Sequence, residues 1–279
     1  KARSLSLDYM PALEGMIQLD LREKNYDAAI AQAQQEIQRD KSAGTPWLLL
    51  GGVYIERALD KARAAGVAKE EEYPLATPAV QQDVNLAEEA LLKATNLEPG
   101  LNSAYRLLAR LYVSSNKQKE ALQELEAFVA RTNDVTAYVQ MALIHSQAKE
   151  HKTAAEIYEK ALEFAPRSVE ILNNLAVIYS DYIPRYDRAA ELARRARRIA
   201  MDSPAVADTM GWVLHKQGDY SQALPLLEYA AKTLSLEPEV QFHLGMTQFK
   251  LGDAPAARQA LERALELNPS FPGAEEARK

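Results

Sequence analysis

Two adjacent stretches decide the fold. Residues 204–237 read PAVADTMGWVLHKQGDYSQALPLLEYAAKTLSLE, and residues 238–271 read PEVQFHLGMTQFKLGDAPAARQALERALELNPSF. Laid one above the other without a gap, they match at a constant offset of 34 residues. The matched pairs are Gly211/Gly245, Gly218/Gly252, Asp219/Asp253, Ala223/Ala257, Leu227/Leu261 and Ala230/Ala264. Self-similarity at this period is typical of stacked helical hairpins, so the sequence predicts an all-α repeat array.

The spacing of the matched residues has a physical reason. Ala223, Leu227 and Ala230 are four and then three residues apart, so they share one face of a helix. A small residue such as Gly211 on the preceding helix lets the two helices approach closely. A Gly-Asp or Asn-Tyr turn between them needs a residue that tolerates left-handed backbone. Each hairpin therefore has apolar surface that only a neighbouring hairpin can bury.

The same pattern occurs earlier in the chain. Trp47, Leu50, Gly51 and Tyr54 lie on one expected helix, and the next carries Ala87, Leu91, Ala94 and Pro99. This pattern resembles the tetratricopeptide repeat (TPR) family. The resemblance covers nearly the whole chain and implies a right-handed superhelical solenoid of about seven units, a single domain over residues 1–279. The expected units are 10–43, 44–101 with an insert at 57–82, 102–134, 135–168, 169–203, 204–237 and 238–271, followed by a C-terminal cap at 272–279.

Two places depart from a regular array. In the insert, we expect the first helix to continue to about Gly66, before a loop that contains Pro74 and Pro78 and a second helix from about Val80. Its acidic stretch Glu70–Tyr73 is either a docking loop or a disordered one. One extra residue at 182–185 should make the turn of the fifth unit bulge.

Composition excludes several classes of function. The net charge of −6 argues against nucleic acid, which needs concentrated basic surface. The absence of cysteine rules out disulfides and thiolate metal sites. No apolar run approaches the roughly 20 residues that span a bilayer, so we expect no transmembrane segment. The chain begins at Lys1 rather than Met, and we expect a fragment or a processed form.

A second, narrower resemblance concerns residues 173–228. They are similar to bacterial TPR proteins tied to exopolysaccharide and protein-sorting systems of the cell envelope, some of them lipoproteins. The compartment stays open between periplasm or cell envelope and cytoplasm.

The TPR resemblance implies that the first helix of each unit lines a concave groove. We expect a peptide anchored on Trp212, Phe242 and Phe249, with Arg106 or Arg110 holding a carboxylate. In the alternative, Trp212 and Phe249 pack against neighbouring helices. The expected groove positions are Arg106, Arg110, Gln140, Asn173, Asn174, Asp208, Trp212, His215, Phe242, His243, Met246 and Phe249.

Some family members hold chaperone tails with a carboxylate clamp of Lys and Asn on successive first helices. Asn174 matches one clamp position, but it is also a common structural residue in the family. Arg106 and Arg110 stand where Lys and Asn belong, so we expect no binding of chaperone C-termini.

Two further clusters have alternative interpretations. Arg194, Arg195, Arg197 and Arg198 either meet an acidic partner, lipid headgroups or nucleic acid, or form a solvated face partly paired with Glu191 and Asp187. His215 and His243 would need a third ligand such as Asp208 to hold a metal, and we expect no metal and no cofactor. No HExxH pair, phosphate loop, GxSxG or dinucleotide fingerprint occurs, so we expect no enzyme.

The sequence thus predicts a non-catalytic scaffold or adaptor that binds a protein or peptide in its groove. Two alternatives stay open. The chain could be a structural subunit of a cell-envelope or filament assembly that uses its convex face and insert. It could also be the recognition domain of a larger enzyme or secretion factor. Self-association is possible in each case.

Overall fold

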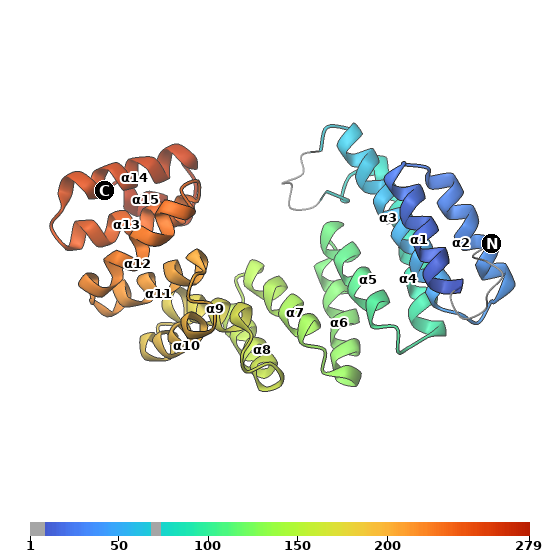
Figure 1. Ribbon diagram of the computed structural model, residues 1–279, viewed down its shortest axis with the longest axis horizontal. Coiled ribbons are helices and arrows are strands. Elements are labelled where there is room, and N and C mark those ends of the chain that lie inside the picture. Colours follow the sequence, from blue (N-terminus) through green and yellow to red (C-terminus); the bar gives the residue numbers. More distant parts are fainter. Residues whose placement is uncertain (1–8, 68–73) are drawn as a thin grey trace. The chain divides into compact units, whose positions relative to one another are not determined.

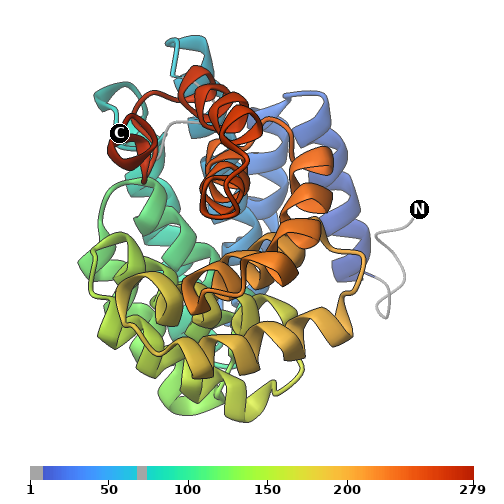
Figure 2. The same cartoon turned by 90° about the vertical axis from the view of Figure 1, so that its left-hand side faces the viewer.

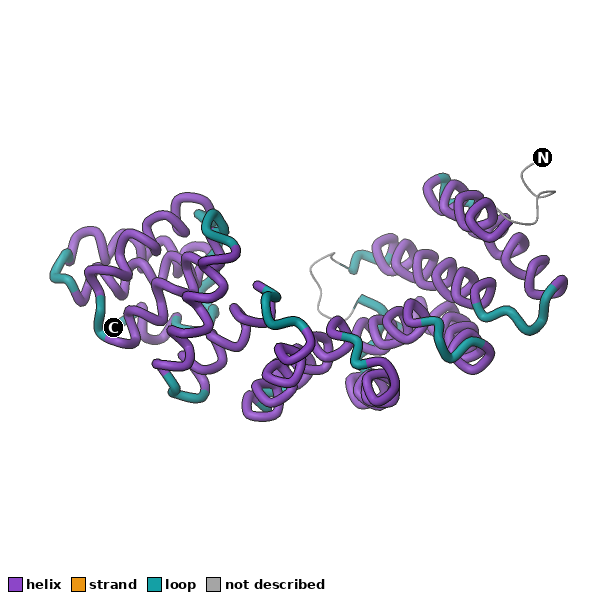
Figure 3. Tube along the Cα trace, turned by 60° about the horizontal axis from the view of Figure 1, so that its bottom comes forward, coloured by secondary structure: helices purple, strands orange, loops and turns teal. Residues whose placement is uncertain are grey.

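The computed structural model describes residues 9–67 and 74–279, and this part of the chain consists of helices and short loops (Figures 1 and 3). The first helices are α1 (Tyr9–Arg22), α2 (Tyr26–Arg39), α3 (Thr45–Ala64), the short 3-10 helix η2 (Pro78–Val80), α4 (Gln81–Leu97), α5 (Asn102–Ser114), α6 (Gln118–Thr132) and α7 (Val135–Gln147). They are followed by α8 (His151–Phe164), α9 (Val169–Val177), η3 (Ile178–Tyr182), α10 (Tyr186–Ile199), α11 (Pro204–Gln217), α12 (Tyr220–Thr233), α13 (Pro238–Lys250), α14 (Ala254–Leu267) and α15 (Ala274–Ala277). The all-α prediction is confirmed.

The chain divides into two compact units, residues 1–144 and 145–279. In the first, α1 packs on α2, α3 on α4 and α5 on α6, and α3 also contacts α1 and α5. In the second, the hairpins are α9–α10, α11–α12 and α13–α14, and Figure 2 shows the last two in orange to red. Six of the predicted helix pairs are therefore present, while the pairing of α7 with α8 and one continuous solenoid across both units stay predictions.

Small residues on the first helices allow the close approach that the repeat spacing predicted. A Cβ atom on Gly211 would lie 2.6 Å from Cγ of Leu227, and one on Gly245 would lie 2.7 Å from Cγ of Leu261. Gly51 faces Leu91 in the same way, at 2.7 Å. Such distances are shorter than carbon–carbon contact allows. The leucine of each second helix thus packs directly on the backbone of the first.

The turns between paired helices contain the left-handed residue that was expected. Gly218 and Gly252 have φ of +85° and +86°, and Asn116 has +59°. In the first unit, however, the prediction placed this role on the Asn25-Tyr26 turn, and the structure gives it to Lys24, at φ +58°. Asn25 instead precedes α2 as its N-cap, with φ of −86°. The left-handed conformation is therefore set by the position in the turn after the first helix, and not by the preference of the side chain for that conformation.

Lys149 provides a direct test of this strain. It is exposed and holds φ at +62°, where an L side chain costs about 1–2 kcal/mol. We expect Lys149→Gly to raise the free energy of unfolding by about 0.5–1 kcal/mol, after the greater flexibility of unfolded glycine is subtracted. Urea denaturation measures this change in the free energy of unfolding. Glu156→Gly, in the middle of α8, is the matched control and should destabilise by about 1 kcal/mol. A loss of stability in both variants would contradict the argument.

The insert follows its predicted outline where the structure describes it. Helix α3 ends at Ala64, and Gly66 then adopts φ +88°, as the expected extension to Gly66 requires. The acidic stretch Glu70–Tyr73 lies outside the described residues. Leu75 is buried, and its N–H donates to the carbonyl of Ser114 at 2.9 Å. The end of the insert is therefore fixed against the end of α5.

The extra residue of the fifth unit is accommodated differently from the prediction. Instead of a bulging turn at 182–185, the end of the first helix widens into a π-helical turn, Ile178–Tyr182. The N–H of Ile183 donates to the carbonyl of Ile178 at 2.9 Å, a bond between residues five apart. The prediction was wrong because a wider helical turn keeps backbone hydrogen bonds that a bulged loop would lose.

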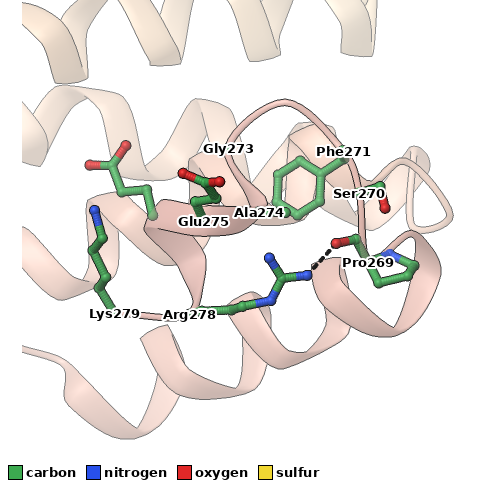
Figure 4. Close-up of a pocket in the computed structure, with 9 residues that line it drawn as sticks. Pro269, Ser270, Phe271, Gly273, Ala274, Glu275, Arg278 and Lys279 are labelled. Atoms are coloured by element: carbon green, nitrogen blue, oxygen red, sulfur yellow. Dashed lines mark hydrogen bonds between the residues drawn. The ribbon is translucent and has the colours of Figure 1, made fainter.

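A short helix covers the last hairpin. Phe271 and Ala274 are buried against Phe242 and Met246. Gly273 connects them at φ +107°, and a Cβ there would lie 2.9 Å from the Phe242 ring. Figure 4 shows the Arg278 guanidinium donating to the carbonyl of Pro269, which closes the loop around α15. The aromatic end of the second unit is thereby kept out of water.

Candidate functional site

The first unit contains a hollow of about 510 Å³ on the face formed by α1, α3 and α5. These are the first helices of three successive hairpins, the elements expected to line the groove. The lining residues are Glu14, Ile17, Gln18, Leu21, Arg22, Leu48, Leu49, Gly52, Glu56, Leu107 and Arg110. The hollow therefore combines an aliphatic floor with a charged rim.

Gly52 leaves the floor of this hollow open. Its neighbour Gly51 faces the partner helix, but a Cβ on Gly52 would have only Cδ2 of Leu107 near it, at 3.9 Å. Nothing in the packing of α3 requires a glycine at this position. Glycine in a helix interior costs about 0.5–1 kcal/mol relative to alanine. Gly52 therefore destabilises its helix slightly and, in exchange, leaves room for a ligand side chain.

Four charged side chains surround the floor: Glu14, Arg22, Glu56 and Arg110. Within the described part of the chain, none of the four forms an ion pair. Arg110 is exposed and belongs to the predicted set, whereas the other predicted arginine, Arg106, pairs with Asp134 at 3.3 Å. The rim can thus meet charges of either sign on a bound segment.

In the second unit, the predicted aromatic strip is mostly core. Trp212 is 6% exposed and, with Phe242 and Met246, belongs to the cluster beneath α15. Its ring stacks on His215 at 4.6 Å and on His243 at 4.1 Å between centroids. Its Nε1–H donates to Oδ1 of Asp181 at 2.8 Å. This burial favours the packing alternative for Trp212, whereas Phe249 is 60% exposed and remains accessible.

The two histidines beside Trp212 are held by different partners. The Thr247 hydroxyl donates to the carbonyl of His243, so it accepts from Nδ1–H of His215 at 2.9 Å. Burial lowers the pKa of His215 to about 4, with smaller contributions from the charges of Lys216, His243 and Lys250. Nδ1 of His243 instead lies 2.9 Å from Oδ1 of Asp208. No three His, Asp or Glu side chains converge on a metal position within residues 9–67 and 74–279.

The remaining predicted residues are polar and lie on α7 and α9. Asn174 donates to the Tyr158 hydroxyl at 3.1 Å. This contact favours a structural role for Asn174 over a role in a carboxylate clamp. Gln140 and Asn173 are half-buried, and each has a shielded amide oxygen without a hydrogen-bond partner. Their shielded amide oxygens thus retain hydrogen-bonding capacity.

Comparison with protein families identifies the repeats. Residues 135–168 and residues 209–273 each match a family model described as tetratricopeptide repeat. These two stretches are tetratricopeptide repeats. The TPR resemblance is confirmed over these units.

Relatives share part of the chain. A TPR repeat-containing protein of Pseudomonas aeruginosa, PA4667, is 28% identical over 58% of this chain and 28% of its own length. The type IV pilus assembly protein PilF of the same species is 30% identical over 49% of this chain and 54% of its own length. A Drosophila melanogaster homologue of the BBSome member BBS4 is 26% identical over 56% of this chain and 32% of its own length. The match thus spans about a third or less of the length of PA4667 and of the BBS4 homologue, and about half of the length of PilF.

Solved structures with low identity share the fold. The crystal structure of YrrB, titled a TPR protein with an unusual peptide-binding site, covers 68% of this chain with 98% of its own, at TM-score 0.54 and 19% identity. A structure of Pseudomonas aeruginosa PilF covers 79% of this chain with 98% of its own, at TM-score 0.58 and 18% identity. Every helix in the described part of the chain is too short or too polar to cross a bilayer.

The sequence did not single out the floor of the hollow. Leu48, Leu49, Gly52 and Leu107 were not among the predicted groove residues, because aliphatic side chains in a TPR helix ordinarily signal core. One signal was present. Gly51 already provides the small residue that the family pattern requires, so the pattern does not explain a second glycine at position 52.

Proposed function

We propose that this TPR protein is a non-catalytic scaffold that binds a segment of a partner protein along its first helices. The hollow around Gly52 is the anchor point, and its open floor is the observation that carries the proposal. TPR repeats typically mediate protein–protein interactions, which supports a protein partner. The mechanism is presentation of a preformed surface, which keeps the ordering cost on the protein side small.

The chemistry of the hollow defines the segment that fits. Leu48, Leu49 and Leu107 offer apolar contact to one aliphatic or aromatic anchor side chain. Glu56 and Arg110 stand at its rim, so a segment with charges of both signs beside the anchor is favoured. Gln140 remains a proposed contact in the same unit, and Phe249 and Asn173 remain proposed contacts in the other unit.

Gly52 gives a test that does not damage the fold. We expect Gly52→Ala to stabilise the protein by about 0.5–1 kcal/mol, and Gly52→Leu to be at least as stable as the wild type while filling the hollow. A peptide selected from a display library on the wild-type protein is then titrated by fluorescence anisotropy. Gly52→Leu should weaken binding at least about tenfold, the equivalent of 1.4 kcal/mol. Unchanged binding in a folded Gly52→Leu protein would exclude this hollow as the anchor.

A cell-envelope role is a finer part of the proposal. The sequence identity to PilF, a type IV pilus assembly protein, and to PA4667 supports a bacterial assembly process. A structural subunit would use its outer face, and the Gly52→Leu variant would then assemble normally. The two functions are distinguished by that single variant.

A further inference from the structure

The arginine run of α10 divides into two sets. Arg195 donates to the carbonyl of Pro166 at 2.9 Å and lies 3.7 Å from Glu191, so its role is structural. Arg194, Arg197 and Arg198 are three and four residues apart and share another face. In the part of the chain that the structure describes, these three have no acidic partner. The sequence interpretation of a face partly paired with Glu191 and Asp187 thus holds for Arg195.

The three arginines border a second hollow, of about 620 Å³, between α10, α11 and α12. Its walls are apolar: Met210 and Leu214 from α11, and Pro225 and Leu226 from α12. No element of the hollow around Gly52 takes part in it. A guanidinium rim above an aliphatic floor is suited to a ligand that carries negative charge next to a medium-sized apolar group.

Two polar groups in this hollow lack their usual partners. Nη1 of Arg197 is shielded from solvent without a hydrogen bond, while its guanidinium is held over the Tyr229 ring at 6.0 Å. Pro225 has no N–H, so the carbonyl of Ser221, four residues earlier in α12, has no helical donor. The rim of the hollow therefore presents guanidinium groups that can pair with a carboxylate.

We propose that this hollow binds an acidic peptide segment of a partner protein, with a leucine-like side chain on the floor and carboxylates on Arg194, Arg197 and Arg198. A peptide can carry both the carboxylates that the rim fits and the aliphatic side chain that the floor fits. The floor has no aromatic side chain on which a nucleic-acid base could stack.

The probe is a fluorescein-labelled peptide with leucines among glutamates, titrated by anisotropy against the whole chain. Arg194→Glu/Arg197→Glu/Arg198→Glu should weaken binding about tenfold or more, since three ion pairs are lost and reversed. Lys232→Glu/Arg258→Glu/Arg263→Glu makes the same change of net charge elsewhere and should leave affinity within about twofold. Far-UV circular dichroism checks that both proteins are folded. An equal loss of peptide affinity in both variants would overturn the assignment of the site to Arg194, Arg197 and Arg198.

Three further outcomes separate the occupants. A peptide with serine in place of leucine should bind at least about fivefold more weakly, and equal affinity would overturn the role of the floor. Phosphatidylserine vesicles or oligothymidine that bind more tightly than the peptide, through the same arginines, would overturn the acidic peptide. Self-association that disappears in the α10 variant while peptide binding persists would assign the hollow to a second copy. The Gly52→Leu variant should bind this probe normally.

Discussion

Trp212→Ala is expected to lower the free energy of unfolding of the 145–279 unit by about 3–5 kcal/mol, the cost of removing a large buried aromatic side chain. The ring is 6% exposed and lies among His215, His243, Phe242 and the covering α15. Truncation leaves a cavity, removes two stacked pairs and deprives Asp181 of its donor, Nε1–H. The local structure cannot collapse easily, since hairpins on both sides hold the site open.

The measurement is urea denaturation followed by far-UV circular dichroism. Trp212→Phe retains a ring and loses only the Asp181 hydrogen bond and part of the stack, so it should cost about 1–2 kcal/mol. The chain's other tryptophan, Trp47, is only half-buried beneath Lys93, and Trp47→Ala should cost less than Trp212→Ala. A Trp212→Ala protein within 1 kcal/mol of the wild type would show that the aromatic stack is peripheral to the fold.

Because Trp212 is part of the core, its variants are poor tests of partner binding. A Trp212 variant that no longer binds a partner would report a disturbed fold as readily as a lost contact. Phe249 and Gly52 are better positions for such tests, because Phe249 is exposed and Gly52 touches little. The anchor of the proposed site therefore moves from the aromatic strip to the hollow of the first unit.

The helices were predictable because the repeat spacing fixes local contacts. Gly211 and Leu227 are 16 residues apart in one hairpin, and Gly245 and Leu261 repeat that separation. Such contacts depend only on one turn and two amphipathic helices, and these are encoded within each repeat. The left-handed residue before α2, α6, α8, α12 and α14 follows from the same local geometry, even where it is a lysine.

The site was less predictable because exposure depends on what lies next to a helix. Trp212 occupies a groove position by family pattern, but His215, His243 and the terminal helix cover it. Asp181 reaches its indole from the end of a π-helical turn that no sequence pattern indicated. The spacing of the α10 arginines could show that Arg194, Arg197 and Arg198 share one helical face. The hollow beneath them depends on the packing of α10, α11 and α12, which spacing does not show.

His215 makes the stability of the second unit depend on pH. Its ring is 8% exposed, and burial lowers its pKa from 6.5 to about 4. Between these values the unfolded chain binds a proton and the folded chain does not, so acid favours unfolding. Stability from this group is complete above pH 6.5, and about 3 kcal/mol should be lost by pH 4, at 1.36 kcal/mol for each pKa unit.

Chemical denaturation at a series of pH values tests this directly. His215→Phe keeps a ring against Trp212 but cannot be protonated, so its stability should fall much less between pH 6.5 and 4. Carboxylates of the chain add a slope of their own at the acid end, and the comparison with His215→Phe subtracts it. If His215→Phe follows the wild-type curve, His215 accepts its proton in the folded state, and the Nδ1–H bond to Thr247 does not hold it neutral.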